Sequence, residues 1–306
     1  MDFSSVFRRG IWSAVLVLLL ATPLTAQIED HLSAYTGQNA EGYLNPLASA
    51  LGTTLGGGMW RSGHIPKSGL NIAIEFPMVG LYFTDDDKYF MGTTEGGFSP
   101  ETTTQVSTVV GPTDAVIVPG DGGTAFAFPG GFDIGSFAIT APQIRVGAVL
   151  GTEAMVRFIA FKIGDSELGD VMLAGFGVRH SISQYLGPEP AVNLAASFYW
   201  QNLKLGENSD GEDLTSTTNY SLGAQASKKF GTVFNPYAGL YYNTYTADIS
   251  YTSEASGEPE ATEISFDDAY VQFTLGLELN LWIINVWGEY NIAEHQSFGA
   301  GFGLAL

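Results

Sequence analysis

Side chains that carry out nucleophilic or metal chemistry are scarce in this chain. It has no cysteine, which excludes a disulfide scaffold, a thiolate metal site and a cysteine nucleophile. The four histidines are His31, His64, His180 and His295; they are far apart in the sequence, and His295 lies beside Glu294. Walker, Rossmann, zincin and Gly-x-Ser-x-Gly patterns are absent from the sequence. We therefore expect no catalytic residues, no enzyme activity and no cofactor.

Two runs of acidic residues, Asp85-Asp86-Asp87 and residues 207–213, could bind a divalent cation. Carboxylate oxygens suit Ca²⁺ and Mg²⁺, although residues 207–213 do not follow the EF-hand pattern. We predict that both runs are solvated loops without a resident metal. A Ca²⁺ or Mg²⁺ ion that bridges them to lipopolysaccharide phosphates is the alternative. The formal charge of −20 argues against binding to nucleic acid.

A small set of charged residues occupies polar positions of the strands predicted below. Such positions would face the lumen of a barrel, where an unpaired charge is costly, so these residues should form ion pairs. The guanidinium fork of arginine suits carboxylates. Two interpretations stay open, a structural brace that closes the lumen and a charged path or carboxylate-binding site. The set comprises Glu75, Arg145, Arg157, Arg179, Glu278 and Glu289, with Glu153 at the periplasmic rim.

Tyrosines recur on the same predicted inner face. Tyr237, Tyr241 and Tyr245 occupy alternate positions of one strand, and Tyr199 belongs to another. Tyrosine offers a flat apolar ring with a polar tip, which suits an apolar or sugar-like ligand. The other interpretation is that these rings fill a narrow barrel.

The elements that would position these residues are β-strands, because polar and apolar residues alternate with period 2. The pattern is clearest after residue 190; in the last strand Phe298, Phe302 and Leu304 alternate with glycines. We predict an all-β fold, an antiparallel up-and-down barrel of ten strands, with twelve as the alternative. The strands are expected at 68–83, 139–149, 153–163, 171–183, 191–204, 216–229, 233–249, 264–280, 282–293 and 296–306.

Composition and connections favour a transmembrane barrel. Only 14% of the residues are charged and 38 are glycine, which is typical of membrane barrels. Short and long connections alternate, as periplasmic turns and extracellular loops do, except that the last one, 294–295, is tight; residues 84–138 form the longest loop. An even number of strands places both ends of the barrel chain in the periplasm. A soluble barrel with its apolar face inward is the alternative.

The N-terminal part of the chain differs from the rest. Arg8 and Arg9, the apolar run 11–20 and the small residue Ala26 predict a signal peptide over 1–26. Residues 27–67 lack strand periodicity and predict two short helices, at 28–35 and 40–51. This segment is expected to be a periplasmic plug that enters the barrel or a cap on one end. Residues 68–306 would form the barrel domain.

Several short stretches resemble known families. Asn45-Pro46-Leu47-Ala48 resembles the Asn-Pro-Ala stretch in the hatch of long-chain fatty-acid transporters of the outer membrane, whose barrels have more strands. A closer resemblance is to a domain-of-unknown-function family of Gram-negative outer-membrane barrels. It rests on residues 43–47, 141–147, 155–158, 175–180 and 227–229. It implies fold and location but no substrate.

We therefore expect a cell outer-membrane barrel that binds or passes a small, hydrophobic molecule, with Asn45 and Pro46 in its plug. Its partners would be outer-membrane lipid, lipopolysaccharide and the barrel assembly machinery. The alternative is a closed anchoring barrel, with a lumen braced by arginine–glutamate pairs, that interacts through its loops.

Overall fold

A computed structural model describes residues 31–33, 35–162, 170–187, 190–206, 214–253 and 260–305. The predicted signal peptide and the acidic run 207–213 lie outside these residues. No helix in the described ranges is both long enough and apolar enough to cross a membrane.

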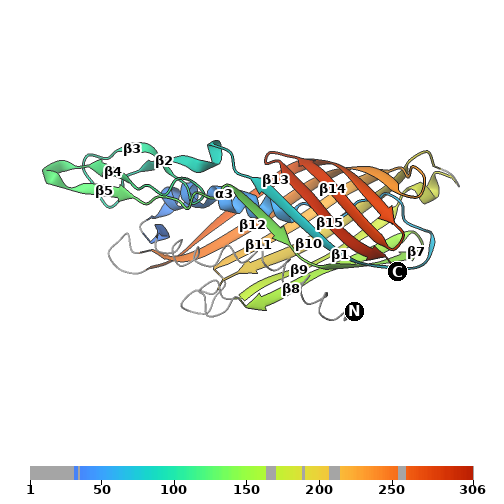
Figure 1. Cartoon of the computed structure of the whole chain (residues 1–306). Coiled ribbons are helices and arrows are strands. Elements are labelled where there is room, and N and C mark those ends of the chain that lie inside the picture. Colours follow the sequence, from blue (N-terminus) through green and yellow to red (C-terminus); the bar gives the residue numbers. More distant parts are fainter. Residues whose placement is uncertain are drawn as a thin grey trace, which may run out of the picture.

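The main sheet is a closed antiparallel barrel (Figure 1). Its eleven strands correspond to ten strands around the barrel, because β6 and β7 act as one strand. Both pair with β1, and they are separated only at Ala141-Pro142. Pairing of β15 with β1 closes the barrel, and the stacked rings of Phe76 and Phe302 span this seam at 5.1 Å. The prediction of ten strands is confirmed, and the alternative of twelve is wrong. The strands are β1 (Ser68–Tyr82), β6 (Ser136–Thr140), β7 (Gln143–Val149), β8 (Thr152–Lys162), β9 (Asp170–Ser181), β10 (Asn193–Leu205), β11 (Thr215–Ser227), β12 (Phe234–Ser253), β13 (Glu260–Leu281), β14 (Ile284–Ile292) and β15 (Ser297–Ala305).

The two ends of the barrel differ in their connections. At one end, which we call the turn end, most connections are tight. Leu150-Gly151 and Trp282-Ile283 join their strands directly, with left-handed backbone at Leu150, Gly151 and Trp282. A short helix, η4 (Ser183–Tyr185), also lies at this end, after β9. The opposite end, the loop end, carries the long connections.

The height of the wall is uneven at the loop end. β12 and β13 are the longest strands, at 20 and 22 residues. β14 stops at Ile292, which pairs with Phe273, so Glu260–Gln272 of β13 extend beyond their neighbour on that side. At the loop end, β14 and β15 therefore stop short of β12 and β13, and the wall is shorter on that side.

Near the turn end, the strand faces follow the predicted arrangement, with apolar side chains outward. Leu222, Leu240 and Phe302 point outward and are 62%, 56% and 52% exposed. Gln225 and Gln272 point into the lumen and are buried. The soluble-barrel alternative, with its apolar face inward, does not describe this part of the wall.

Nearer the loop end, the two faces exchange character along the same strands. The outward positions of β12 change from apolar Leu240 and Tyr242 to polar Thr246 and Asp248. The inward positions change from Asn243 to Ala247, Ile249 and Tyr251, which are buried. The period-2 pattern of the sequence did not predict this inversion of the two faces. It means that only the turn-end part of the wall presents an apolar outer surface.

The connection between β1 and β6, residues 83–135, forms a folded lobe rather than the loop predicted over 84–138. It contains two hairpins, formed by β2 (Tyr89–Thr93) with β3 (Thr103–Ser107) and by β4 (Val116–Pro119) with β5 (Ala125–Phe128). Short helix η2 (Asp86–Lys88) precedes the first hairpin, and η3 (Asp121–Gly123) lies between the two strands of the second. The lobe projects beyond the loop end (Figure 1). The sequence did not predict it because its strands are too short to display periodicity.

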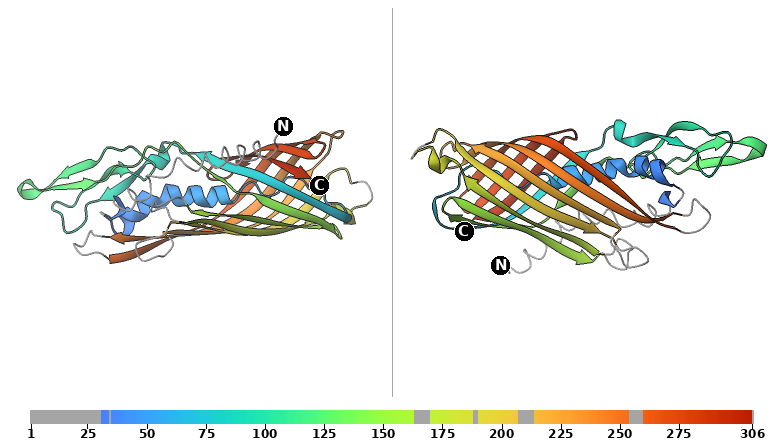
Figure 2. Two further views of the ribbon diagram at one scale, coloured as in Figure 1. Left: turned by 60° about the horizontal axis from the view of Figure 1, so that its bottom comes forward. Right: turned by 180° about the vertical axis from the view of Figure 1, so that it is seen from behind.

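The longest helix among the described residues, α3 (Gly37–Leu55), lies in the mouth of the barrel between the tall strands and the lobe (Figure 2). It is longer than the helix predicted at 40–51. Its start packs on the lobe, where Tyr35 and Tyr43 join a core with Val109 and Phe128. Burial raises the pKa of the Tyr43 phenol, whose hydroxyl donates to the Gly130 carbonyl at 3.0 Å.

The far end of α3 packs against the wall. Leu51 and Leu55 belong to one buried cluster with inward-facing residues of the wall, on the loop-end side of the polarity inversion. These wall residues are Val171, Leu173 and Leu203. These apolar inward residues are explained by the helix, because they would otherwise line a solvated mouth.

Candidate functional site

The chain that follows α3 runs through the lumen to the turn end, and we call residues 37–66 the plug. Gly58 N–H donates to Glu289 Oε1 at 2.9 Å, in the middle of the barrel. Farther along, Gly63 N–H donates to Ser227 Oγ at 2.9 Å, near the turn end. Backbone passes close to the wall here, and a side chain at Gly63 would meet the Asn193 carbonyl. The part of the plug that follows α3 therefore lies against the inner side of the wall.

Arg61 of the plug is the centre of a buried ion network. Its guanidinium binds both oxygens of Glu75 and approaches Glu278 Oε1 at 3.4 Å through Nε. It also lies over the Trp287 ring, 3.7 Å from the centroid. Sequence reasoning missed Arg61 because the plug has no strand pattern that would place it. One signal was present, since Arg61 is the only Lys or Arg in residues 27–66.

Wall residues extend the network around the lumen. Arg145 bridges two carboxylates, Glu75 at 2.6 Å and Glu153 at 3.0 Å. Glu153, at the turn end of β8, also accepts from Arg179 at 3.0 Å; it is buried and belongs to the network. Arg179 in turn donates to the Ser62 carbonyl of the plug. Guanidinium groups and carboxylates thus alternate from β13 to β9, with the plug at the centre.

Two predicted members of the network have different partners. In the described part of the chain, Arg157 contacts no carboxylate; it donates to the Gly58 carbonyl at 3.0 Å and to Gln143 Oε1 at 2.8 Å. Glu289 accepts from Gly58 and from the Tyr237 hydroxyl at 2.8 Å. Both residues therefore hold the plug backbone rather than each other.

The four predicted tyrosines all face inward, and three of them contact the plug. Tyr241 O–H donates to the Trp60 carbonyl at 3.4 Å, and Tyr245 O–H to Ser49 Oγ at 3.5 Å. Tyr199 packs with Trp60 and Tyr241 in one buried cluster. Two interpretations of these tyrosines were open, a ligand pocket and filling of the barrel. In the structure, their rings contact the plug of the same chain.

The network couples the plug to the wall. Removing one partner from a buried ion pair typically costs about 3–5 kcal/mol, because the remaining charge is left without a counter-ion. Arg61 and Glu75 are both buried, so each depends on the other. The arrangement can hold a segment in the lumen and exclude ions from it. It offers no nucleophile with an adjacent base.

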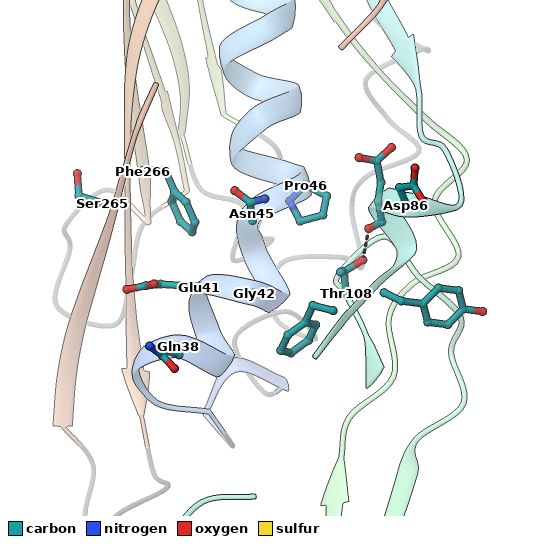
Figure 3. A pocket seen from close by; sticks show the side chains of 12 residues that line it. Gln38, Glu41, Gly42, Asn45, Pro46, Asp86, Thr108, Ser265 and Phe266 are labelled. Atoms are coloured by element: carbon teal, nitrogen blue, oxygen red, sulfur yellow. Dashed lines mark hydrogen bonds between the residues drawn. The ribbon is translucent and has the colours of Figure 1, made fainter. Parts of the chain in front are cut away.

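A cleft of about 420 Å³ opens at the loop end (Figure 3). One face of α3 forms its floor, including the predicted plug residues Asn45 and Pro46. Its lining has carboxylates and aromatic rings but neither Lys nor Arg. The lining residues are Gln38, Glu41, Gly42, Asn45, Pro46, Asp86, Asp87, Tyr89, Phe90, Thr108, Ser265 and Phe266.

The described residues form no metal-binding group of side chains. Within them no three His, Asp or Glu side chains are arranged to hold a metal ion, and this includes Asp85-Asp86-Asp87. The histidines stay apart, since His31 binds Tyr43 and Gly130 while His64 contacts Asn193. His295 approaches Asp87 at 3.9 Å.

Similar solved structures are outer-membrane proteins. The outer membrane protease OmpT from Escherichia coli is 7% identical, with a TM-score of 0.37, over 79% of this chain and 98% of that chain. The beta domain of the Bordetella autotransporter BrkA is 10% identical, with a TM-score of 0.34, over 76% and 98%. The Ralstonia pickettii toluene transporter TbuX is 10% identical, with a TM-score of 0.28, over 80% and 90%.

No curated protein matches the chain. A family model does match, over residues 9–306, and it describes a family of unknown function, DUF6588. The match covers nearly the whole chain, including the plug, the lobe and the barrel. The chain therefore belongs to the DUF6588 family.

Proposed function

We propose that this protein is an outer-membrane barrel, sealed by its own N-terminal segment, that displays an acidic binding lobe at the cell surface. The observation that carries the proposal is the plug, which runs the length of the lumen and is held there by the buried Arg61–Glu75 pair.

The outer face of the wall supports a membrane location. On β12 the outward residues are apolar from Phe234 to Tyr242 and become polar from Thr244 onward. Those nine residues match the strand length that crosses a hydrocarbon core, about 9–11 residues. Aromatic Tyr220 and Tyr242 lie near the boundary, as interfacial side chains do. The polarity inversion therefore marks the outer edge of the bilayer.

The lobe is the surface available for an extracellular partner. Tight turns of outer-membrane barrels face the periplasm and long connections face outward, so the lobe lies outside the cell. Residues 83–135 carry eight acidic residues and one basic residue, Lys88. This charge disfavours contact with lipopolysaccharide phosphates and holds the lobe away from the membrane surface.

Electrical and biochemical measurements test the seal and the location. The protein should fractionate with outer membranes and show heat-modifiable gel mobility. In planar bilayers the wild type should give no steady conductance, whereas deletion of residues 37–66 should open the lumen. A steady wild-type current would contradict the seal.

Orientation can be tested on intact cells because the chain lacks cysteine. Single variants Glu101→Cys and Gln38→Cys, at exposed positions of the lobe and of α3, should react with an impermeant maleimide. Lys229→Cys, exposed at the turn end, should react only after the outer membrane is permeabilised. The opposite pattern would reverse the proposed topology.

Passage of a small, hydrophobic molecule is the second candidate. The observation that favours it is the cleft, because a ligand bound there would touch the plug directly at Asn45 and Pro46. Passage would then require the plug to leave the lumen. Fatty-acid and detergent binding to the purified protein, combined with conductance, would test this candidate.

A further inference from the structure

The outer half of β13 has an unpaired edge. β12 pairs with β13 without a break from Ser253↔Glu260 to Phe234↔Leu279, whereas β14 pairs only from Phe273 onward. Over residues 260–272, β13 therefore pairs with one strand, β12, among the residues that the structure describes. Unpaired edges of this kind are templates for another strand.

The register identifies which groups point to the free side. Asn280 N–H donates to the Val233 carbonyl at 2.8 Å, so even-numbered residues of β13 bond to β12. Because backbone direction alternates along a strand, odd-numbered residues turn their N–H and C=O groups away from β12. Ala269 agrees with this, since its N–H donates to the Asp268 carboxylate at 2.7 Å instead of to a strand. The free-edge residues are Ala261, Glu263, Ser265, Asp267, Ala269 and Val271.

This edge lies in water rather than in lipid. The outward side chains of β13 change from Val271 and Phe273, which are apolar, to Asp267 and Ser265, which are polar. The inversion falls at the same level as on β12. An incoming chain can therefore reach the edge from the extracellular side without entering the bilayer.

The acidic cleft borders the free edge. Ser265 and Phe266 of β13 form one of its sides, and Glu41 reaches toward that strand from α3 (Figure 3). Asp86 supplies a further carboxylate from the lobe, and Phe90 adds an aromatic ring. A lysine or arginine side chain would find carboxylates and ring faces together there.

We propose that β13 binds an extended, basic peptide segment by strand addition, with basic side chains of that segment in the cleft. The inference rests on the proposed surface location of the lobe and names its partner by chemistry. Backbone groups at the free edge supply the main-chain bonds, and alternate side chains supply selectivity, as in other β-augmentation sites.

The negative charge of the free edge of β13 favours a basic peptide over other partners. Glu263, Asp267 and Asp268 lie on the free part of β13, and no Lys or Arg follows Lys229 in the sequence. A second copy of this edge would bring like charges together, which disfavours self-pairing. A basic strand is complementary on both the edge side and the cleft side.

The test uses the full protein in detergent and a fluorescent peptide, Lys-Thr-Lys-Val-Lys-Thr-Lys. We expect saturable binding that weakens as salt is raised, and none by the counterpart with every lysine replaced by glutamate. Two further peptides carry N-methyl groups at odd or at even positions. Because an added strand pairs through one edge, one of these two should lose binding and the other keep it.

Protein variants locate the site. Glu41→Gln with Asp86→Asn should weaken peptide binding about fivefold, the effect of two exposed ion pairs. The matched control, Glu101→Gln with Asp114→Asn, removes the same charge from exposed lobe positions outside the cleft and should leave binding unchanged.

Several results would overturn the inference. They are no binding by the lysine peptide, equal behaviour of the two N-methylated peptides, and equal effects of the two double variants. Displacement by n-butylammonium at the peptide's own concentration would also do so, because it would show that the lysine side chain binds without strand pairing. Self-association through β13 would do so too. The measurement in detergent does not depend on orientation, so its failure is distinct from failure of the surface labelling on cells.

Discussion

At the scale of single residues, the plug depends most on Arg61. We expect Arg61→Ala to lower the free energy of unfolding by about 3 kcal/mol, because Glu75 and Glu278 lose a buried counter-ion. Thermal unfolding followed by gel mobility would measure this. The control is Lys88→Ala, whose exposed pair with Asp85 should contribute less than about 1 kcal/mol. Equal effects of the two variants would contradict a brace centred on Arg61.

Arg157 tests the brace in another way, because it binds the plug backbone at Gly58 and the wall amide of Gln143. We expect Arg157→Ala to lower the thermal midpoint while the protein stays closed in planar bilayers, since the Arg61–Glu75 pair remains. A larger current with unchanged stability would instead assign Arg157 to a conducting path.

At the scale of elements, the strands were predictable because each turns one face inward and the other outward, which imposes period 2 on long segments. Predicted and observed bounds therefore agree closely, as for 216–229 and β11 (Thr215–Ser227). The lobe was not predictable, because its hairpins pack on Tyr35 and Tyr43 through contacts distant in sequence. The charged wall residues were predicted from alternation, whereas Arg61 was missed because its position depends on where the plug lies.

Close packing of α3 against β12 can be tested at Gly52. A side chain at Gly52 would overlap the Tyr245 ring. We expect Gly52→Val to destabilise the protein by about 1–3 kcal/mol through overpacking, and the added change Tyr245→Ala to restore part of it. Unfolding of both variants would be compared with Gln38→Val, an exposed helix position with little expected effect. Absence of any rescue would argue against contact between the two positions.

At the scale of the whole molecule, the outer surface of the wall has an apolar part, which we propose faces lipid, and a polar part that would face water. We expect Leu240→Arg to destabilise the protein in membranes by about 2–4 kcal/mol, since it places a charge on the lipid face. Thr246→Arg, on the same face of β12 beyond the inversion, should cost much less and can pair with Asp267, which now accepts from Thr246. Equal, small costs at both positions would indicate a wall that faces water throughout.

The plug is the feature that separates a sealed anchor from a gated path. Ser62 Oγ and Ser227 Oγ lie 3.1 Å apart, so Ser62→Cys with Ser227→Cys should form a disulfide that ties the plug to β11 near the turn end. Because the chain has no cysteine of its own, the oxidised and reduced proteins differ in this bond alone. For a sealed anchor, we expect equal conductance and equal peptide binding in both forms. Uptake or current that appears only after reduction would instead show that the plug moves out of the lumen, and it would establish passage as the function.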